Sequence, residues 1–187
     1  MVIKQFAIGF AFATLLLVAG VLSAHAEVAE SNSTGFAIFE KALSSVPPAK
    51  LYEALIHPEN WWNAEHSFSH DARNLSLDAR AGGCLCETLP NGGSVQHLVV
   101  IFVAPGKTLR LKGAMGPFQG QGLEGTLTFN LTPEGSGTAL ELDYNIGGFM
   151  KGGFGKMPQA ADAMLTDLVA HLKYYAENGT AMPPPAK

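Results

Sequence analysis

The residues best suited to chemistry in this 187-residue chain lie in GGCLCETLPNGGSVQH, residues 82–97. This stretch holds both cysteines, Cys84 and Cys86, and ends in His97. In a strand, residues two positions apart share a face and lie about 6.6 Å apart, so a disulfide between these cysteines would need a local kink. A two-residue turn at Asn91-Gly92 would place His97 opposite Cys86, on the cysteine face. Two thiols and an imidazole are possible ligands of zinc or copper(I), provided that a fourth ligand is supplied.

The alternative is that the two cysteines are small apolar residues that line a pocket. Zinc-binding cysteine pairs usually lie on turns with wider spacing, which favours this alternative. Glu87 and Gln96 would then occupy the other face of the hairpin, so we expect the face with the cysteines to be the inner one. For the metal site, the connector after the first helical segment offers His57, His66 and His70 as possible fourth ligands.

Other motifs argue against nucleotide and nucleophile chemistry. The run GQGLEG, residues 120–125, has the G-x-G-x-x-G spacing of dinucleotide sites, but the strand-like TLTFNL follows it where that motif needs a helix. The sequence contains no G-x-S-x-G nucleophile elbow. We therefore expect no cofactor. An enzyme with His97 or His66 as its general base remains an alternative.

A set of strands followed by one long helix must position these residues. Residues 158–177 repeat apolar side chains at intervals of three and four, which predicts an amphipathic helix that ends before Asn178-Gly179. A shorter helix is expected at 49–56, after two prolines. A sheet with one dry face must bury it, and the long helix offers the matching apolar stripe. The fold class is therefore α+β, a helix-grip fold in which a curved antiparallel seven-stranded sheet wraps around the C-terminal helix. The expected strands are residues 36–43, 73–79, 84–89, 94–104, 107–114, 123–131 and 138–146.

One turn conflicts with this pattern. A two-residue turn at Pro105-Gly106 would place Leu109 and Leu111 on the opposite face from His97 and Val99. A three-residue turn or a β-bulge would return the leucines to the inner face, and we assume that one of these is present.

The two ends of the chain carry their own signals. Lys4, a long uncharged run and then Ala24-His25-Ala26 are typical of a signal peptide, residues 1–26. The alternative is a membrane helix, because the run approaches the ~20 residues that span a bilayer. Cleavage would leave a flexible leader at 27–34, one ligand-binding domain at 35–177 and a disordered tail at 178–187. The net charge of −4 offers no basic patch for nucleic acid. We expect a periplasmic or secreted protein without membrane contact after cleavage.

The order of these segments resembles the START-like superfamily, also called SRPBCC, in its polyketide-cyclase and heat-shock-ATPase-activator-like branches. The resemblance covers about residues 35–176 and rests on HPENWW, AGGCLCE, VQHLVVIFVAPGKTLRL, GAMGPFQG, LEGTLTF and GTALELDY. It implies the helix-grip fold and a cavity, between the sheet and the C-terminal helix, that binds a small apolar molecule. We do not expect the chaperone-activator role, because an exported protein would not meet a cytosolic ATPase.

The resemblance also implies which side chains bind the ligand. Inward residues of the sheet and the helix would line the cavity, and the Trp61-Trp62 connector and residues 113–122 would lie near its mouth. The glycine-rich residues 147–156 would form either a lid or a tight linker. The expected ligand-binding residues are Trp61, Trp62, Cys84, Cys86, His97, Val99, Met115, Phe118, Leu127, Phe129, Leu142, Tyr144, Met164, Leu168 and His171.

The leading interpretation is an exported carrier or sensor of a small hydrophobic molecule, with His97 and Tyr144 as polar groups that contact it. A zinc or copper site at Cys84, Cys86 and His97 is the first alternative. The second, which the resemblance suggests, is an enzyme of cyclase or hydrolase type with a histidine as general base.

Overall fold

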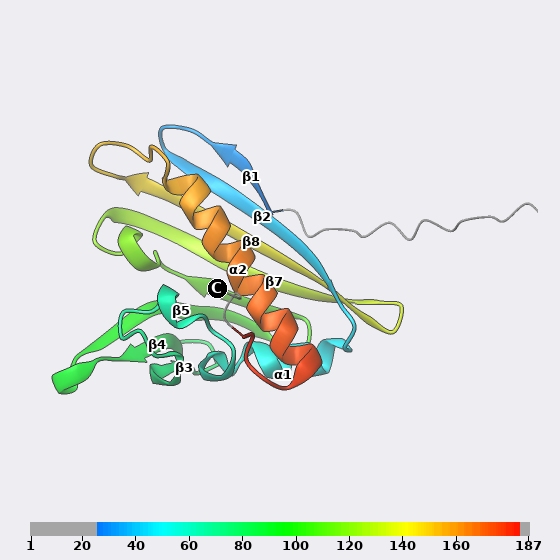
Figure 1. Ribbon diagram of the computed structural model, residues 1–187. Coiled ribbons are helices and arrows are strands. Elements are labelled where there is room, and N and C mark those ends of the chain that lie inside the picture. The colour runs from blue at the N-terminus through cyan, green and yellow to red at the C-terminus, as the bar shows by residue number, and fades with distance from the viewer. Residues whose placement is uncertain (1–25, 184–187) are drawn as a thin grey trace, which may run out of the picture.

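The computed structural model describes residues 26–183, in which an antiparallel sheet curves around a long helix (Figure 1). The eight strands follow the order β1-β2-β8-β7-β6-β5-β4-β3. The strands are β1 (Ala26–Ser31), β2 (Gly35–Ser44), β3 (Leu75–Leu77), β4 (Cys84–Thr88), β5 (Ser94–Ala104), β6 (Thr108–Lys112), β7 (Gly122–Glu134) and β8 (Gly137–Phe149). The helices are α1 (Pro48–Leu55) and α2 (Met157–Asn178), with the 3-10 turns η1 (Pro58–Asn60), η2 (Ala64–His66), η3 (Ala72–Asn74), η4 (Pro90–Gly92) and η5 (Gly116–Phe118). The predicted helix-grip α+β fold is confirmed, with one strand more than expected.

The additional strand, β1, lies in the segment that was expected to be a flexible leader. It pairs antiparallel with β2, with Ala26 opposite Glu40 and Ser31 opposite Phe36. Val28 of this polar segment packs against the core, and backbone pairing with the edge of β2 holds the strand. Except for Ala26, the predicted signal peptide lies outside the described residues, as do residues 184–187.

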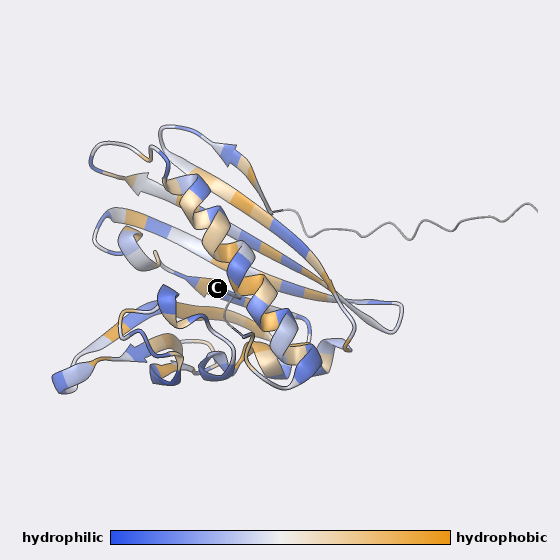
Figure 2. Cartoon of the chain, viewed as in Figure 1, coloured by the Kyte–Doolittle hydropathy of each residue, from blue (hydrophilic) through white to orange (hydrophobic). Residues whose placement is uncertain are grey.

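Helix α2 covers the sheet along its apolar stripe. Pro158 lies in the first turn, where its missing N–H is tolerated, and Gly179 ends the helix with a φ of 73° in the left-handed region. The helix packs against β1, β2 and α1, and Figure 1 shows it crossing one face of the sheet. Figure 2 shows polar and apolar residues interspersed along the helix and the long strands, as expected for elements with one buried face. The buried residues of the helix are Pro158, Ala161, Leu165, Leu168, Val169, Leu172 and Ala176.

Two bulges in β5 decide which of its side chains face the helix. Thr88 pairs with Ser94, so the β4–β5 loop has five residues and not two. The register then shifts between Leu85 and Cys86 of β4, which leaves His97 of β5 as an additional residue. A second shift leaves Ile101 as an additional residue opposite β6.

Both of the assumed features occur near the turn at Pro105-Gly106. Ala104 pairs with Thr108, so three residues form the turn, and the bulge at Ile101 precedes it in β5. Each feature shifts the alternation by one residue, so together they cancel, and Leu111 pairs with Val100 while Val99 stays on the other face. Leu109 and Leu111 are buried in the core, and His97 lies on their face because of its own bulge. Neither of the two helices in the described range combines the length and apolarity that a membrane span requires.

Candidate functional site

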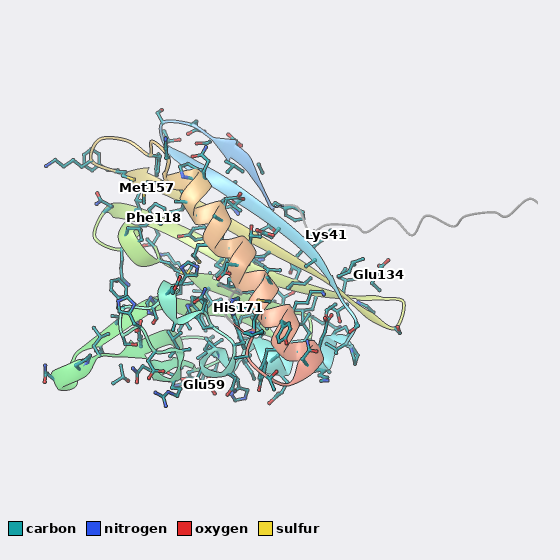
Figure 3. The ribbon with its side chains drawn as sticks, viewed as in Figure 1. Lys41, Glu59, Phe118, Glu134, Met157 and His171 are labelled. Carbon is teal, nitrogen blue, oxygen red and sulfur yellow. A yellow bond between two sulfur atoms is a disulfide. The ribbon has the colours of Figure 1, made fainter. Side chains whose placement is uncertain are left out.

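A pocket of about 430 Å³ lies beside the N-terminal half of α2. The connector that includes η2, the loop around η5, strand β8 and α2 itself form its walls. Figure 3 shows Phe118 and Met157 at the end of the molecule where α2 begins, and His171 farther along the helix. The lining residues are Trp62, Glu65, His66, Ser67, Phe68, His97, Met115, Gly116, Pro117, Phe118, Tyr144, Met157, Ala160, Ala161 and Met164.

A buried carboxylate holds one polar group of this pocket in place. Glu87 of β4 is buried, and its Oε2 accepts a hydrogen bond from His97 Nε2 at 2.9 Å. The backbone N–H groups of Phe68 and Ser69 donate to the same carboxylate. Burial acts to raise the pKa of Glu87, but the hydrogen bonds from Ser69, His97 and Phe68 outweigh it and hold that pKa below its ordinary value. Glu87 is therefore ionised at neutral pH.

The ionised carboxylate fixes the tautomer of His97. Because Glu87 can only accept, Nε2 of the imidazole carries the hydrogen, and Nδ1 has no hydrogen-bond partner within residues 26–183. The ring of Phe68 stacks on the imidazole, with the ring centroids 5.8 Å apart. His97 lines the pocket, so it presents an oriented polar group that can accept a hydrogen bond or a proton from a bound molecule.

Tyr144 supplies a second polar group in the same pocket. Its ring is buried, and its hydroxyl accepts from the backbone N–H of Met115 at 3.5 Å. Burial raises the pKa of Tyr144 to about 12, so the hydroxyl stays neutral and keeps its hydrogen. The pocket thus combines a mostly apolar wall with an imidazole and a phenol, an arrangement typical of small-molecule sites.

A histidine and an aspartate meet at the rim of the pocket. His66 Nε2 lies 3.2 Å from Asp167 Oδ2, which also accepts from the side chain of Asn63 at 2.9 Å. Both side chains of the pair are about one third exposed, at 33% and 34%, so solvent screens their attraction. This contact joins the connector to α2 beside the pocket.

The structure places the sequence-predicted residues in four groups, of which the fourth, on the outer face of the sheet, is described below. Trp61, Leu127 and Phe129 border a separate void of about 20 Å³. Leu142 and Leu168 are buried in the hydrophobic core, and the Nδ1 of His171 lies 3.1 Å from the backbone carbonyl oxygen of Trp61. The predicted residues that do line the pocket are Trp62, His97, Met115, Phe118, Tyr144 and Met164.

The prediction that Cys84, Cys86 and Val99 line the pocket is wrong. Leu85 and Glu87 occupy the inner face of β4, so the two cysteines alternate to the outer face and Val99 is paired with Cys84 there. The cysteines form a disulfide with each other, with their Cα atoms 5.4 Å apart. The local kink that such a bond requires is present as the bulge at His97.

The predicted metal site is wrong for the same reasons. The disulfide engages both sulfur atoms, and His97 points to the opposite face of the sheet, toward Glu87. Within residues 26–183, no three side chains of His, Cys, Asp or Glu lie together as a set of metal ligands.

Sequence reasoning missed Glu87 and Phe68. Glu87 was placed on the outer face because the β4–β5 turn was taken as two residues long. The sequence does contain a glutamate and a histidine on the two strands of one hairpin. This pair predicts a side-chain contact only when the length of the hairpin loop is known. The glycine-rich residues 147–156 do not line the pocket, and Phe154 within them is buried against Phe36, with the ring centroids 5.5 Å apart. This contact favours the tight linker over the lid.

An antiparallel sheet that grips a C-terminal helix and leaves an apolar pocket beside it defines a START-like domain, a class that binds small hydrophobic molecules. The chain belongs to the family described as Activator of Hsp90 ATPase homolog 1-like protein, which matches residues 45–173. The predicted superfamily is thereby confirmed. No curated protein matches the chain.

Solved structures share the fold at low sequence identity. A conserved protein of unknown function from Enterococcus faecalis has a TM-score of 0.58 and 13% identity, with 89% of this chain and 84% of that chain covered. CalU16 from Micromonospora echinospora has a TM-score of 0.53 and 18% identity, over 81% and 78% of the two chains. The Aha1 dimer from Colwellia psychrerythraea has a TM-score of 0.52 and 19% identity, over 76% and 97%. At these identities the likeness concerns the fold.

Proposed function

We propose that this protein is an exported carrier or sensor that holds one small, mostly apolar molecule in the pocket beside α2. The observation that carries the proposal is the pocket itself, about 430 Å³ with apolar walls and two oriented polar groups, His97 and Tyr144. Its volume falls within the ~300 to 1,000 Å³ of typical small-molecule sites. A ligand with a polar group at one end would place that group at the imidazole and the phenol, and its apolar body along α2.

The export part of the proposal is supported by the N-terminal sequence and by the cysteines. Residues 1–26 have the basic start, apolar run and small-residue ending of a removable signal. The Cys84–Cys86 disulfide suits an oxidising compartment, because thiols of cytosolic proteins are kept reduced. Sequencing the N-terminus of the fractionated protein tests this part, and a retained residue 1 in the mature protein contradicts it.

The ligand is sought by solvent extraction of natively purified protein followed by mass spectrometry. A panel of fatty acids and aromatic polyketides is then screened for a rise in melting temperature. We expect a ligand of the class that co-purifies to stabilise the protein by mass action. The carrier proposal fails if nothing co-purifies and no member of the panel raises the melting temperature.

Two exposed alanines of α2 provide a matched pair of variants. Ala160 lines the pocket and Ala163 does not, although they lie three residues apart on the same helix. We expect Ala160→Phe to weaken binding of the extracted ligand at least about tenfold, equivalent to about 1.4 kcal/mol, because the ring occupies ligand space. Ala163→Phe should bind as the wild type does. Equal binding by the two variants places the ligand elsewhere.

A further inference from the structure

Strand β4 carries different chemistry on its two faces. Cys84 and Cys86 are half-buried on the outer face, where they form the disulfide. Leu85 and Glu87 are buried on the inner face, where Glu87 holds His97 and the connector at Phe68. A change in the backbone between the two cysteines therefore acts directly on the residue that orients the polar group of the pocket.

The disulfide and the bulge at His97 occupy the same place in the sheet. The Cα atoms of the two cysteines lie 5.4 Å apart. Two residues of an extended strand span about 6.6 Å, so β4 is contracted between them. The register shift falls between Leu85 and Cys86, inside the segment that the disulfide closes. The bond and the additional residue thus belong to one local distortion, and that distortion turns the imidazole toward Glu87.

The two cysteines also lie near an edge of the sheet. Only the three-residue strand β3 lies beyond β4 in the sheet, and Ser76 of β3, which pairs with Cys86, is exposed. Both cysteines retain part of their accessible surface. Thiol–disulfide exchange requires that a thiolate reach a sulfur atom, and this edge of the sheet gives it access.

We propose that Cys84–Cys86 is a thiol-exchange site for low-molecular-weight thiols, and that its reduction displaces the Glu87–His97 contact. A thiolate RS⁻ attacks one cysteine sulfur, the S–S bond breaks, and the other cysteine leaves as a thiolate. A second RS⁻ attacks the sulfur of R in this mixed disulfide and releases the first cysteine. Two thiols RSH become RSSR, and their two protons and two electrons pass to Cys84 and Cys86.

Reduction frees β4 to extend and to change its pairing with β5. Extension removes the contraction that accompanies the bulge. If the register of the Cys84–Val99 pair then extends along β4, Cys86 pairs with His97 and Thr88 with Val95. The imidazole would then leave Glu87. The proposal is independent of the proposed carrier function, because its consequences are read at the cysteines and at His97 without any ligand.

The test uses the full folded protein with and without excess dithiothreitol. Free thiols are counted with a thiol-reactive dye in the absence of denaturant, and the His97 imidazole is followed by NMR. We expect both cysteines of the single disulfide to become reactive while the near-ultraviolet circular dichroism persists, and we expect the His97 resonances to move. The double variant Cys84→Ser, Cys86→Ser should show the reduced resonances without reductant.

Ser76→Ala is the matched control, because it alters the outer-face neighbour of Cys86 and leaves the disulfide intact. It should keep the oxidised resonances of His97. The proposal is overturned if the thiols appear only in denaturant, or if they appear and the His97 resonances stay unchanged. If the double variant does not fold, reduction of the wild type decides alone.

Discussion

Glu87 is a buried carboxylate that hydrogen bonds keep ionised. Three N–H groups, from Phe68, Ser69 and His97, donate to its two oxygens. A buried charge without such partners destabilises the folded state. The removal of one partner therefore lowers the free energy of unfolding. The residue therefore stabilises the connector and the pocket together, although it does not itself line the pocket.

Replacement of this carboxylate should destabilise the protein in a pH-dependent way. In Glu87→Gln, an amide group that donates replaces an oxygen that accepts, so we expect a loss of about 2 kcal/mol of unfolding free energy at neutral pH. Because the pKa of Glu87 is lowered in the folded state, its contribution is present above the unfolded pKa and is lost as pH falls through the folded pKa. The difference from wild type should therefore shrink in acid.

Urea unfolding at neutral and acid pH measures this difference. Exposed Glu134 provides the control, and Glu134→Gln should match the wild type at both pH values. A Glu87→Gln variant that is as stable as wild type at neutral pH would show that the carboxylate is not held as described.

At this scale the sequence identified the polar groups of the pocket better than their partners. His97 and Tyr144 were predicted to face inward, and both do. The partner Glu87 and the outward positions of the cysteines depend on a five-residue loop and on one additional residue in β5. A bulge has no strong local signature in the residue types, so the alternation of side chains alone assigned these faces incorrectly.

The contact between α2 and β2 contains a second kind of buried carboxyl. Glu40 is 1% exposed beneath α2, and its Oε1 accepts from the hydroxyl of Thr166 at 2.6 Å. Its Oε2 and the Oδ1 of Asp162 are buried without a partner among the described residues. Burial raises the pKa of Glu40, the hydrogen bond from Thr166 opposes this, and the charge of Asp162 adds to the rise. The pKa of Asp162 is also raised by burial.

This element contact should therefore lose stability as pH rises. An acid with a raised folded pKa contributes fully below its unfolded pKa, and the contribution disappears as pH rises through the folded pKa. We expect Glu40→Gln to be more stable than wild type at neutral pH by about 1 kcal/mol, because no buried charge remains there. The advantage should vanish in acid, where Glu40 of the wild type is protonated.

Melting temperature against pH measures the effect. Glu53→Gln removes an exposed carboxylate that forms an ion pair with the exposed His57, and it should follow the wild-type curve. A Glu40→Gln curve that runs parallel to that of wild type at all pH values would contradict the assignment.

At the scale of elements, the periodic patterns predicted α2 and the seven strands that carry alternating side chains. The sequence of β1, AEVAES, has a single apolar side chain of any size, Val28, and its pairing with β2 is a backbone interaction. Such pairing leaves little trace in residue types, which is why the segment was expected to be flexible.

The whole molecule combines a solid core with a hollow along the same helix. Leu165 of α2 is fully buried, whereas its neighbour Met164 lines the pocket. A side chain in a packed core loses contacts on every side when truncated, but one beside empty space has fewer to lose. The sequence could place both residues on the apolar stripe. Which of them lies in the packed core and which beside the pocket depends on how the surrounding side chains fill space.

This difference gives a prediction about the free protein. We expect Leu165→Ala to cost about 2–5 kcal/mol of unfolding free energy and Met164→Ala about 1 kcal/mol or less. Chemical denaturation of the two variants and the wild type, without ligand, measures both values. Similar costs at the two positions would mean that the pocket is closed in solution.

The two bulges of β5 make the interior of the pocket depend on the count of residues in one strand. The deletion of a single residue between positions 98 and 104 would shift every side chain before it in the strand by one place. Gln96 would then take the place of His97 in the pocket, and the imidazole would move to the buried place of Leu98, opposite Leu85. Relatives that differ by one residue in this strand can therefore differ completely in what they hold, even where their folds superimpose.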